Sequence, residues 1–321
     1  MAKNLIPYFI EKQYLQNITH GSFHGYALFV DISGFTKLTQ LLLKKGSPGA
    51  ETLSNILNDT FAPMVQLTYN EGGFIPYFAG DAFTGIFTEE KDANEIIGLA
   101  QKIVSYFDHQ STFLTPFGKF EVKIKIGISF GIIDWGIIGE KNHTFFFRGQ
   151  AIDNSAYSQT KAQEQEIVVD FNFNEKIKFN FNTMAIPNTP YFLLSKENPE
   201  INISSNSTYP SLSLDVLSKF QPKEVIEFNQ IGEFREVISI FISFEGLLSY
   251  DLLNQFGSKI LELFLNHSGY FKEIDFSDKG GVIVGFFGAP VSYENNQERA
   301  FYCANDSLTI RFKFGTQPQQ S

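Results

Sequence analysis

The 321-residue sequence contains little cysteine and no excess of positive charge, and each shortage excludes a class of protein. Cys303 is the single cysteine, so neither an intramolecular disulfide nor a cysteine-rich zinc site can form. The formal net charge is −10, which disfavours a nucleic-acid or anionic-membrane binder, because both need Lys and Arg to neutralise phosphates. This charge remains compatible with a small phosphate ligand that is held through metal ions.

Long apolar runs are also missing. The longest, residues 280–291, is well short of the roughly 20 residues that a bilayer-spanning helix needs. The apolar start at residues 5–10 runs directly into Glu11 and Lys12, unlike a secretory signal. We therefore expect a cytoplasmic globular protein with no membrane span and no nucleic-acid partner. Its length and its 43% hydrophobic residues are sufficient for two domains, each with its own core.

Hydrophobic periodicity predicts a mixture of helices and strands, which we interpret as an α+β domain over residues 24–195 that follows an N-terminal segment at 1–23. Apolar residues at helical spacing predict helices over residues 38–43, 53–69, 93–107 and 150–163. Short apolar or alternating runs bounded by turn residues predict strands. These strands are expected at 26–32, 74–78, 83–87, 120–133, 144–148, 167–170 and 191–194.

The last third of the chain repeats part of this pattern after a polar segment, residues 196–233, which we interpret as a linker. Residues 238–247 align with the first strand and its turn, and residues 269–288 repeat the strand, acidic turn and strand of 73–87. Residues 298–308 repeat the next helix. Nothing after Lys313 matches the later strand and helix, so we expect a second, incomplete domain at 234–321 with a disordered tail from residue 315.

Two aspartates, Asp31 and Asp81, each lie at the end of a predicted strand. Carboxylates at strand ends can converge without both leaving water, and such hard oxygen ligands suit Mg²⁺ or Mn²⁺. The strand-to-helix turn at residues 33–36 offers backbone N–H groups and a positive helix end to a phosphate. The alternative is that each aspartate is only a turn or N-cap residue.

The two motifs together are more specific than either alone. The sequence FVDISGFT at 29–36, followed by GG-x4-FAGDA at 72–82, resembles the catalytic domains of class III adenylate/guanylate cyclases. It is most similar to the soluble, tandem-domain adenylyl cyclases and their bacterial relatives, over most of residues 24–195. The segment NLIPYF at 4–9 resembles their leader, and residues 274–291 resemble their second cyclase domain.

This resemblance implies a ferredoxin-like βαββαβ core, with a mainly antiparallel sheet and covering helices, and conversion of ATP to cyclic AMP and pyrophosphate. It implies two Mg²⁺ or Mn²⁺ ions held by Asp31, Asp81 and the backbone carbonyl of Ile32. The remaining implied residues bind the triphosphate: Ser33, Gly34, Phe35, Thr36 and Lys125. For Lys125, a solvated strand lysine is an equally good interpretation.

In this family, the active site forms between two cyclase domains, and the second domain supplies an Asn and an Arg from the helix after a Gly-Gln turn. Asp153 and Tyr157 occupy those positions in the first copy, so the other half is expected from domain pairing within the chain or from a homodimer. Ser243 replaces the metal-binding aspartate in the second copy. Asp278 is expected to be a hairpin residue rather than a ligand.

The purine base is expected to contact Lys272 or Glu273, because alignment on residues 278–280 places Glu273 at the base position with Lys272 just before it. A lysine would donate to adenine N1, whereas a glutamate would accept from guanine N1 and N2. We expect ATP as the substrate and retain GTP as an alternative. A nucleotide-binding regulatory module without turnover is a further alternative, and a structural homodimerisation domain fits the retained acidic motifs poorly.

Overall fold

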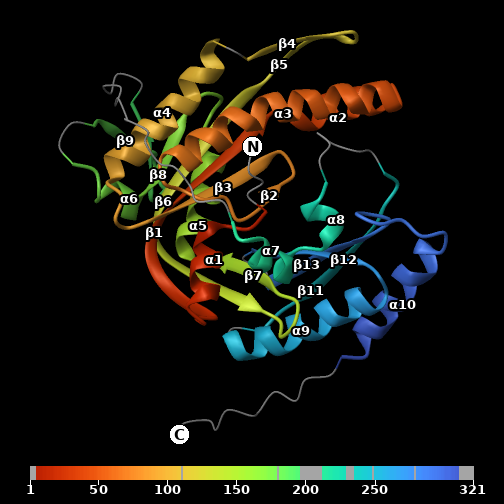
Figure 1. The fold of residues 1–321 in the computed structure, drawn as a ribbon. Helices are drawn as coiled ribbons and strands as arrows, with labels where there is room; N and C mark the ends of the chain where they lie inside the picture. Colours follow the sequence, from red (N-terminus) through yellow and green to blue (C-terminus); the bar gives the residue numbers. More distant parts are fainter. Residues whose placement is uncertain are drawn as a thin grey trace, which may run out of the picture.

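The computed structural model describes residues 5–109, 111–178, 181–195, 212–228, 235–247, 249–277 and 280–310. They form two packed α+β units, of which the first holds the larger sheet and the second a smaller one (Figure 1). The predicted α+β class, with a sheet dominated by antiparallel pairs, is confirmed.

The first unit is built on a sheet with the strand order β2-β3-β1-β6-β8-β10-β9, and β7 pairs with β6. Every named pair in it is antiparallel except β6 with β8. Its strands are β1 (His20–Ser33), β2 (Phe78–Ala79), β3 (Ala82–Thr88), β6 (Lys123–Ile138), β7 (Thr144–Arg148), β8 (Ile167–Asp170), β9 (Thr183–Ala185) and β10 (Tyr191–Leu194).

Helices cover this sheet and exclude water from its apolar residues. Helix α4 shows why, because Ile96, Ile103 and Phe107 recur at helical spacing and are buried against the sheet. Figure 1 shows α3 running beside α4 above the strands. The helices of the first sheet are α2 (Phe35–Leu43), α3 (Ser47–Asn70), α4 (Ala93–His109), α5 (Gln150–Lys161) and α6 (Phe171–Asn174).

Two strand predictions were wrong in their boundaries. The strand expected at 120–133 is divided, because β4 (Thr112–Thr115) and β5 (Gly118–Glu121) form a separate hairpin before β6 begins. The strand expected at 74–78 is reduced to the two residues of β2 and one isolated bridge from Phe74 to Ile86. Pro76 accounts for the second difference, since proline has no N–H to donate to a neighbouring strand.

The expected leader contributes to the first core. Helix α1 (Tyr8–Leu15) lies within it, and the side chains of Ile6 and Ile10 are buried in the hydrophobic core of the first unit. Strand β1 also begins inside this segment, at His20.

The expected linker also contains regular structure. Helices α7 (Leu214–Phe220) and α8 (Lys223–Ile226) lie within it, and the buried side chains of α7 join the first core. The backbone N–H of Ser213 donates to Glu11 at 2.7 Å, and the rings of Tyr14 and Phe220 are 5.4 Å apart. Residues 196–211 and 229–234 of the expected linker lie outside the described part of the chain.

The second unit has a three-stranded sheet in the order β11-β13-β12, with two helices packed on it. Its strands and its last helix lie at the positions of the predicted repeat, whereas residues 278 and 279 of the acidic turn lie outside the described residues. Asp278 and the tail from residue 315 lie outside the described residues. The elements are β11 (Ile238–Phe244), α9 (Tyr250–Asn266), β12 (Tyr270–Ser277), β13 (Gly280–Phe287) and α10 (Asn296–Leu308).

The two units share apolar surface at the end of β6 and along β7. Ile138 and Phe146 belong to the first sheet, yet both are buried in the core of the second unit. The hydroxyl of Tyr250 on α9 donates to the carbonyl of Ile137 at 2.6 Å, and its ring stacks on His20. Among the described helices, none is both long enough and apolar enough to cross a bilayer.

Candidate functional site

The structure brings Asp31 and Asp81 together at neighbouring strand ends. Asp31, near the end of β1, pairs across the sheet with Ala82, and Asp81 immediately precedes Ala82 in the turn between β2 and β3. The backbone N–H of Ile32 donates to the carbonyl of Asp81 at 3.1 Å, which ties the turn to β1. The sheet register therefore places the two residues side by side, and the charge of Asp81 acts on the Asp31 carboxyl group.

Asp31 is half-buried, and its electrostatic surroundings favour a nearby cation. Burial is the main factor that raises the pKa of its carboxyl group, and the negative charge of Asp81 raises it further. Lys125 lies directly across the sheet on β6 and acts in the opposite direction. A second positive charge beside the carboxylates would relieve the repulsion between them.

Gln159 is a site residue that the sequence analysis missed. It is buried on α5, and its side-chain Nε2 donates to Oδ2 of Asp31 at 2.7 Å. The sequence contained a signal for it, because Ser155, Ser158 and Gln159 put polar groups at helical spacing on the buried face of α5. Polar residues on a core-facing helix surface need hydrogen-bond partners, and one of these partners is a predicted metal ligand.

The turn after β1 leads directly into the N-terminus of a helix. Gly34 adopts a left-handed conformation, with φ of 81°, and helix α2 begins at the next residue. No side chain caps this helix start, so its first backbone N–H groups have no intrahelical acceptor. Ser33 and Thr36 flank the same turn.

The two predicted base-contacting residues lie on β12 of the second unit, at a β-bulge. The register steps from the pair Phe271–Gly285 to the pair Glu273–Val284, so Lys272 is the additional residue. Lys272 is exposed and donates from Nζ to Oε1 of Glu273 at 2.8 Å. Burial raises the pKa of the Glu273 carboxyl, and Lys272 partly opposes this.

Tyr77, which precedes the turn that carries Asp81, is close enough to β12 for the charges of that strand to affect its hydroxyl group. Burial raises the pKa of Tyr77 far above its ordinary range, and the charges of Asp275, Glu273 and Asp153 raise it further. The first two of these carboxylates are on β12, whereas Tyr77 lies four residues before Asp81. The base-contact candidates therefore lie close to the segment that leads to the acidic pair, and Asp275 was absent from the predicted site.

Helix α5 does not supply the asparagine and arginine that the resemblance associates with transition-state contacts. Asp153 is partly buried, and Tyr157 is 45% exposed to solvent. The part of the second unit that the structure describes ends at residue 310 and holds no counterpart of α5.

The two carboxylates at the strand ends fit a divalent cation that takes its other ligands from groups other than side chains. Within the described residues, no group of three or more His, Cys, Asp or Glu side chains is arranged to hold a metal ion. The Asp31 and Asp81 carboxylates would therefore need to be joined by backbone oxygen, water or phosphate oxygens, which is how Mg²⁺ is commonly bound.

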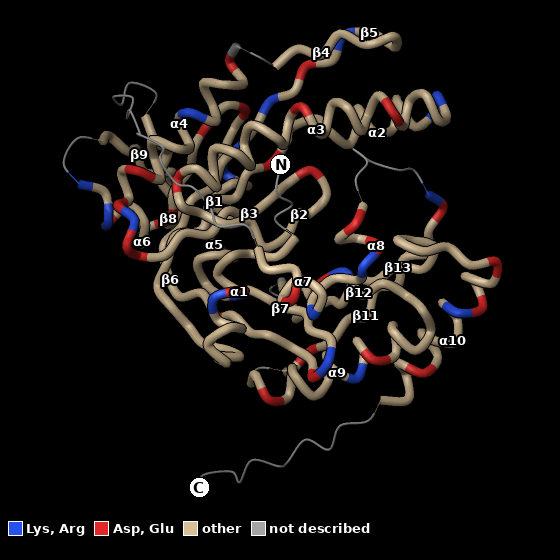
Figure 2. Tube along the Cα trace, in the orientation of Figure 1, with Lys and Arg blue, Asp and Glu red and all other residues tan. Residues whose placement is uncertain are grey.

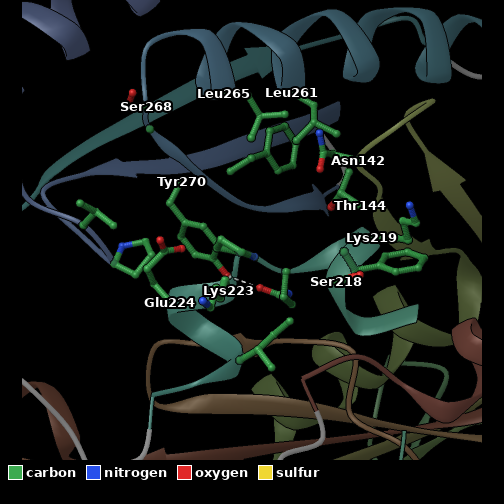
Figure 3. Close-up of a pocket in the computed structure, with 18 of the residues that line it drawn as sticks. Asn142, Thr144, Ser218, Lys219, Lys223, Glu224, Leu261, Leu265, Ser268 and Tyr270 are labelled. Carbon is green, nitrogen blue, oxygen red and sulfur yellow. Dashed lines mark hydrogen bonds between the residues drawn. The ribbon is translucent and has the colours of Figure 1, made fainter. Parts of the chain in front are cut away.

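A separate cavity of about 580 Å³ lies between α7–α8 and the second unit. Figure 3 shows Leu261 and Leu265 of α9 on one side of it and Lys223 and Glu224 of α8 on the other, with Tyr270 between them. None of the predicted site residues lines it. In the view of Figure 2, Lys and Arg are dispersed over both units, without a continuous basic strip.

Comparison with known proteins identifies the family. Residues 26–186, half of the chain, match the family model described as the adenylate and guanylate cyclase catalytic domain. The chain therefore belongs to the class III adenylate/guanylate cyclase family, and the predicted resemblance is confirmed.

Among curated proteins, human adenylate cyclase type 10 is 32% identical over 156 residues, and its mouse counterpart is 30% identical over 154 residues. Each match covers 47% of this chain but only 10% of the relative. Among solved structures, the adenylyl cyclase CyaB from P. aeruginosa is similar, with a TM-score of 0.47 and 17% identity over 58% of this chain and all of that one. The guanylyl cyclase Cya2 has a TM-score of 0.46 and 17% identity over 59% of this chain and all of that one.

Proposed function

We propose that this protein is an adenylate cyclase that converts ATP to cyclic AMP and pyrophosphate for intracellular signalling. One observation carries the proposal: the carboxylates of Asp31 and Asp81, from the two motifs of the family, lie at the ends of adjacent strands. That the curated relatives are adenylate cyclases favours ATP over GTP. A cytoplasmic location remains a prediction.

In this proposal, Asp31, Asp81 and the backbone carbonyl of Ile32 hold two Mg²⁺ or Mn²⁺ ions. Such ions supply Lewis acidity, which makes the ribose 3′-hydroxyl a better nucleophile and neutralises charge on the departing pyrophosphate. The chain itself orients the triphosphate. The turn at Ser33, Gly34, Phe35 and Thr36, which leads into the N-terminus of α2, and the ammonium group of Lys125 bind its oxygens, so that the hydroxyl can be held in line with the leaving oxygen.

The base contact is assigned to the bulge of β12. Lys272 donates to adenine N1 in this proposal, because its ammonium group is exposed and can move from Glu273 to the base. If Glu273 is instead the contact, it accepts from guanine N1 and N2, and GTP becomes the substrate. Because only adenine and guanine are in question, an assay of both ATP and GTP identifies the substrate.

The test is to incubate the protein with ATP or GTP in the presence of Mg²⁺ or Mn²⁺ and to quantify cyclic AMP, cyclic GMP and pyrophosphate. We expect cyclic AMP from the wild type and none above background from Asp31→Ala. Cyclic GMP alone would move the assignment to a guanylate cyclase. Product that is unchanged in Asp31→Ala would contradict the role of the acidic pair.

A second candidate is a regulatory module that binds nucleotide and metal without turnover. It is favoured by Asp153 and Tyr157, which occupy the positions of the family's asparagine and arginine on α5. Under this hypothesis, ATP binds in a manner that depends on Mn²⁺ and on Asp31, but neither cyclic nucleotide is produced.

A further inference from the structure

The hydrogen bond between Gln159 and Asp31 links a helix to the acidic pair. Gln159 is buried, with 9% of the residue exposed, and its Nε2 lies 2.7 Å from Oδ2 of Asp31. A buried amide has few alternative partners, so this bond restricts the rotamer of the carboxylate. The remaining carboxylate lone pairs stay available to another ligand.

A glycine on the sheet brings the helix close enough for this bond. Gly127 on β6 pairs with Phe29 on β1, two residues before Asp31. A Cβ atom at Gly127 would lie 2.0 Å from the carbonyl oxygen of Ser155 and 2.3 Å from the backbone nitrogen of Gln159. The backbone of α5 therefore rests directly on β6 at the turn that carries Gln159, and any larger residue would displace it.

The groups around Asp31 have distinct roles. Lys125 faces it from β6 and Asp81 faces it from the β2–β3 turn, so both act on it through charge. Gln159 faces it from α5 and is neutral, so it can orient the carboxylate without competing as a cation or adding repulsion. An ion pair from a lysine at this position would instead neutralise the carboxylate and weaken its binding of a metal ion.

We propose that Gln159 is a positioning residue that holds the carboxylate of Asp31 in the orientation required to bind divalent cations, with Gly127 setting the distance. In this unit, α5 carries Asp153 and Tyr157 where the resemblance implies transition-state residues, and its contribution to the site is this hydrogen bond. The inference rests on the proposed function, since it assumes that Asp31 is a metal ligand.

Removing the amide tests the proposal. In Gln159→Leu, the buried volume is similar and the donor is lost, and we expect the Mn²⁺ dissociation constant to rise about 10- to 100-fold, as for other partners of metal ligands. Mn²⁺ binding to the whole protein, with and without ATP, is measured by electron paramagnetic resonance or calorimetry and needs no turnover. Gln163→Leu is the matched control, because Gln163 is exposed just beyond the end of α5.

Two further measurements separate positioning from a general loss of structure. The metal concentration for half-maximal turnover should rise more than kcat falls, and Gln159→Leu should cause no further loss of Mn²⁺ affinity in an Asp31→Ala background. Gln159→Asn retains a donor one methylene shorter and should recover part of the affinity. Thermal unfolding of each variant shows whether it is folded at the assay temperature.

The outcomes distinguish this inference from the proposed function. Unchanged Mn²⁺ affinity in a folded Gln159→Leu protein overturns the inference while leaving the cyclase proposal intact. Equal losses in Gln159→Leu and Gln163→Leu also overturn it. A wild type whose Mn²⁺ affinity depends on Asp31 and Gln159 but which forms no cyclic nucleotide contradicts turnover and supports the positioning role.

Discussion

The ends of β1 and β11 occupy equivalent places in the two units but carry different chemistry. Asp31 pairs with Ala82 on β3, and Ser243 pairs with Val282 on β13 in the same antiparallel arrangement. Three residues after each of these two positions is a glycine in the left-handed region, with φ of 81° at Gly34 and 75° at Gly246.

The comparison shows that this turn conformation persists where the acidic pair does not. Gly281 precedes Val282, as Asp81 precedes Ala82, so neither carboxylate is present at these two paired positions of the second unit. The strands also differ in their neighbours. Strand β1 lies between β3 and β6, whereas β11 pairs only with β13 among the described strands. A glycine turn is therefore a weak indicator of a site, and two carboxylates brought together by sheet register are a stronger one.

The largest expected effect is on turnover, and it distinguishes Asp31 from Ser243, the residue at the equivalent place in the second unit. Asp31→Ala should lower turnover by about 10³-fold or more, because a lost metal contact is worth several kcal/mol in the transition state. Ser243→Ala should change turnover less than about twofold by the same scale. Initial rates of cyclic AMP formation compare the two, and equal effects would remove the distinction between the strand ends.

Strand β7 offers a second comparison, since its consecutive side chains enter different cores. Phe146 is buried in the second core and Phe147 in the first. Each change to alanine should lower the free energy of unfolding by about 3–5 kcal/mol. Hydrogen exchange should locate the loss at β11–β13 for Phe146→Ala and at β1 and α1 for Phe147→Ala, and the same pattern for both variants would show that the cores are not separate.

The two turn glycines should have similar structural roles and different functional ones. Gly34→Ala and Gly246→Ala should each cost about 1 kcal/mol of stability, because a Cβ is disfavoured in the left-handed region although both positions have space for it. Only Gly34→Ala should also weaken ATP binding. Denaturant titration and fluorescent-nucleotide binding measure the two effects, and weaker ATP binding in Gly246→Ala would contradict the assignment.

The smallest expected effect concerns pH in the metal-free protein. The pKa of Asp31 is raised in the folded state, so its ionised form destabilises the protein at neutral pH, and this destabilisation disappears as the pH falls through the raised pKa. Asp31→Asn should therefore raise the Tm at pH 7 and have little effect at pH 3. Ser243→Asn is the control, which should show no such dependence, and scanning calorimetry across pH tests both.

Much of the first sheet and the two aspartates could be predicted, because both depend on short stretches of neighbouring residues. An apolar run followed by Asp-Ile-Ser-Gly indicates a buried strand that ends in a turn, and the helix at 93–107 follows from apolar residues at helical spacing. That Asp31 and Asp81 are adjacent needed the register of β1 with β3, which the family resemblance implied.

Contacts between distant segments could not be predicted. The bond from Gln159 to Asp31 joins residues 128 positions apart, and only the polar character of a buried helix face pointed to it. The bulge at Lys272 depends on how β12 pairs with β13, so the sequence left the base contact one residue uncertain. Within the expected linker, α7 is apolar on one side, but its packing against the first core depends on the fold.

The contact between α1 and α7 has a consequence for how the first unit is made. Glu11 accepts a hydrogen bond from the backbone N–H of Ser213, which is 202 residues further along the chain. During synthesis, the N-terminal residues of the unit therefore cannot make this contact until Ser213 has left the ribosome. A polypeptide cut at residue 195 should consequently leave Tyr14 without Phe220 and resist proteolysis poorly, whereas one extended through residue 228 should be protected.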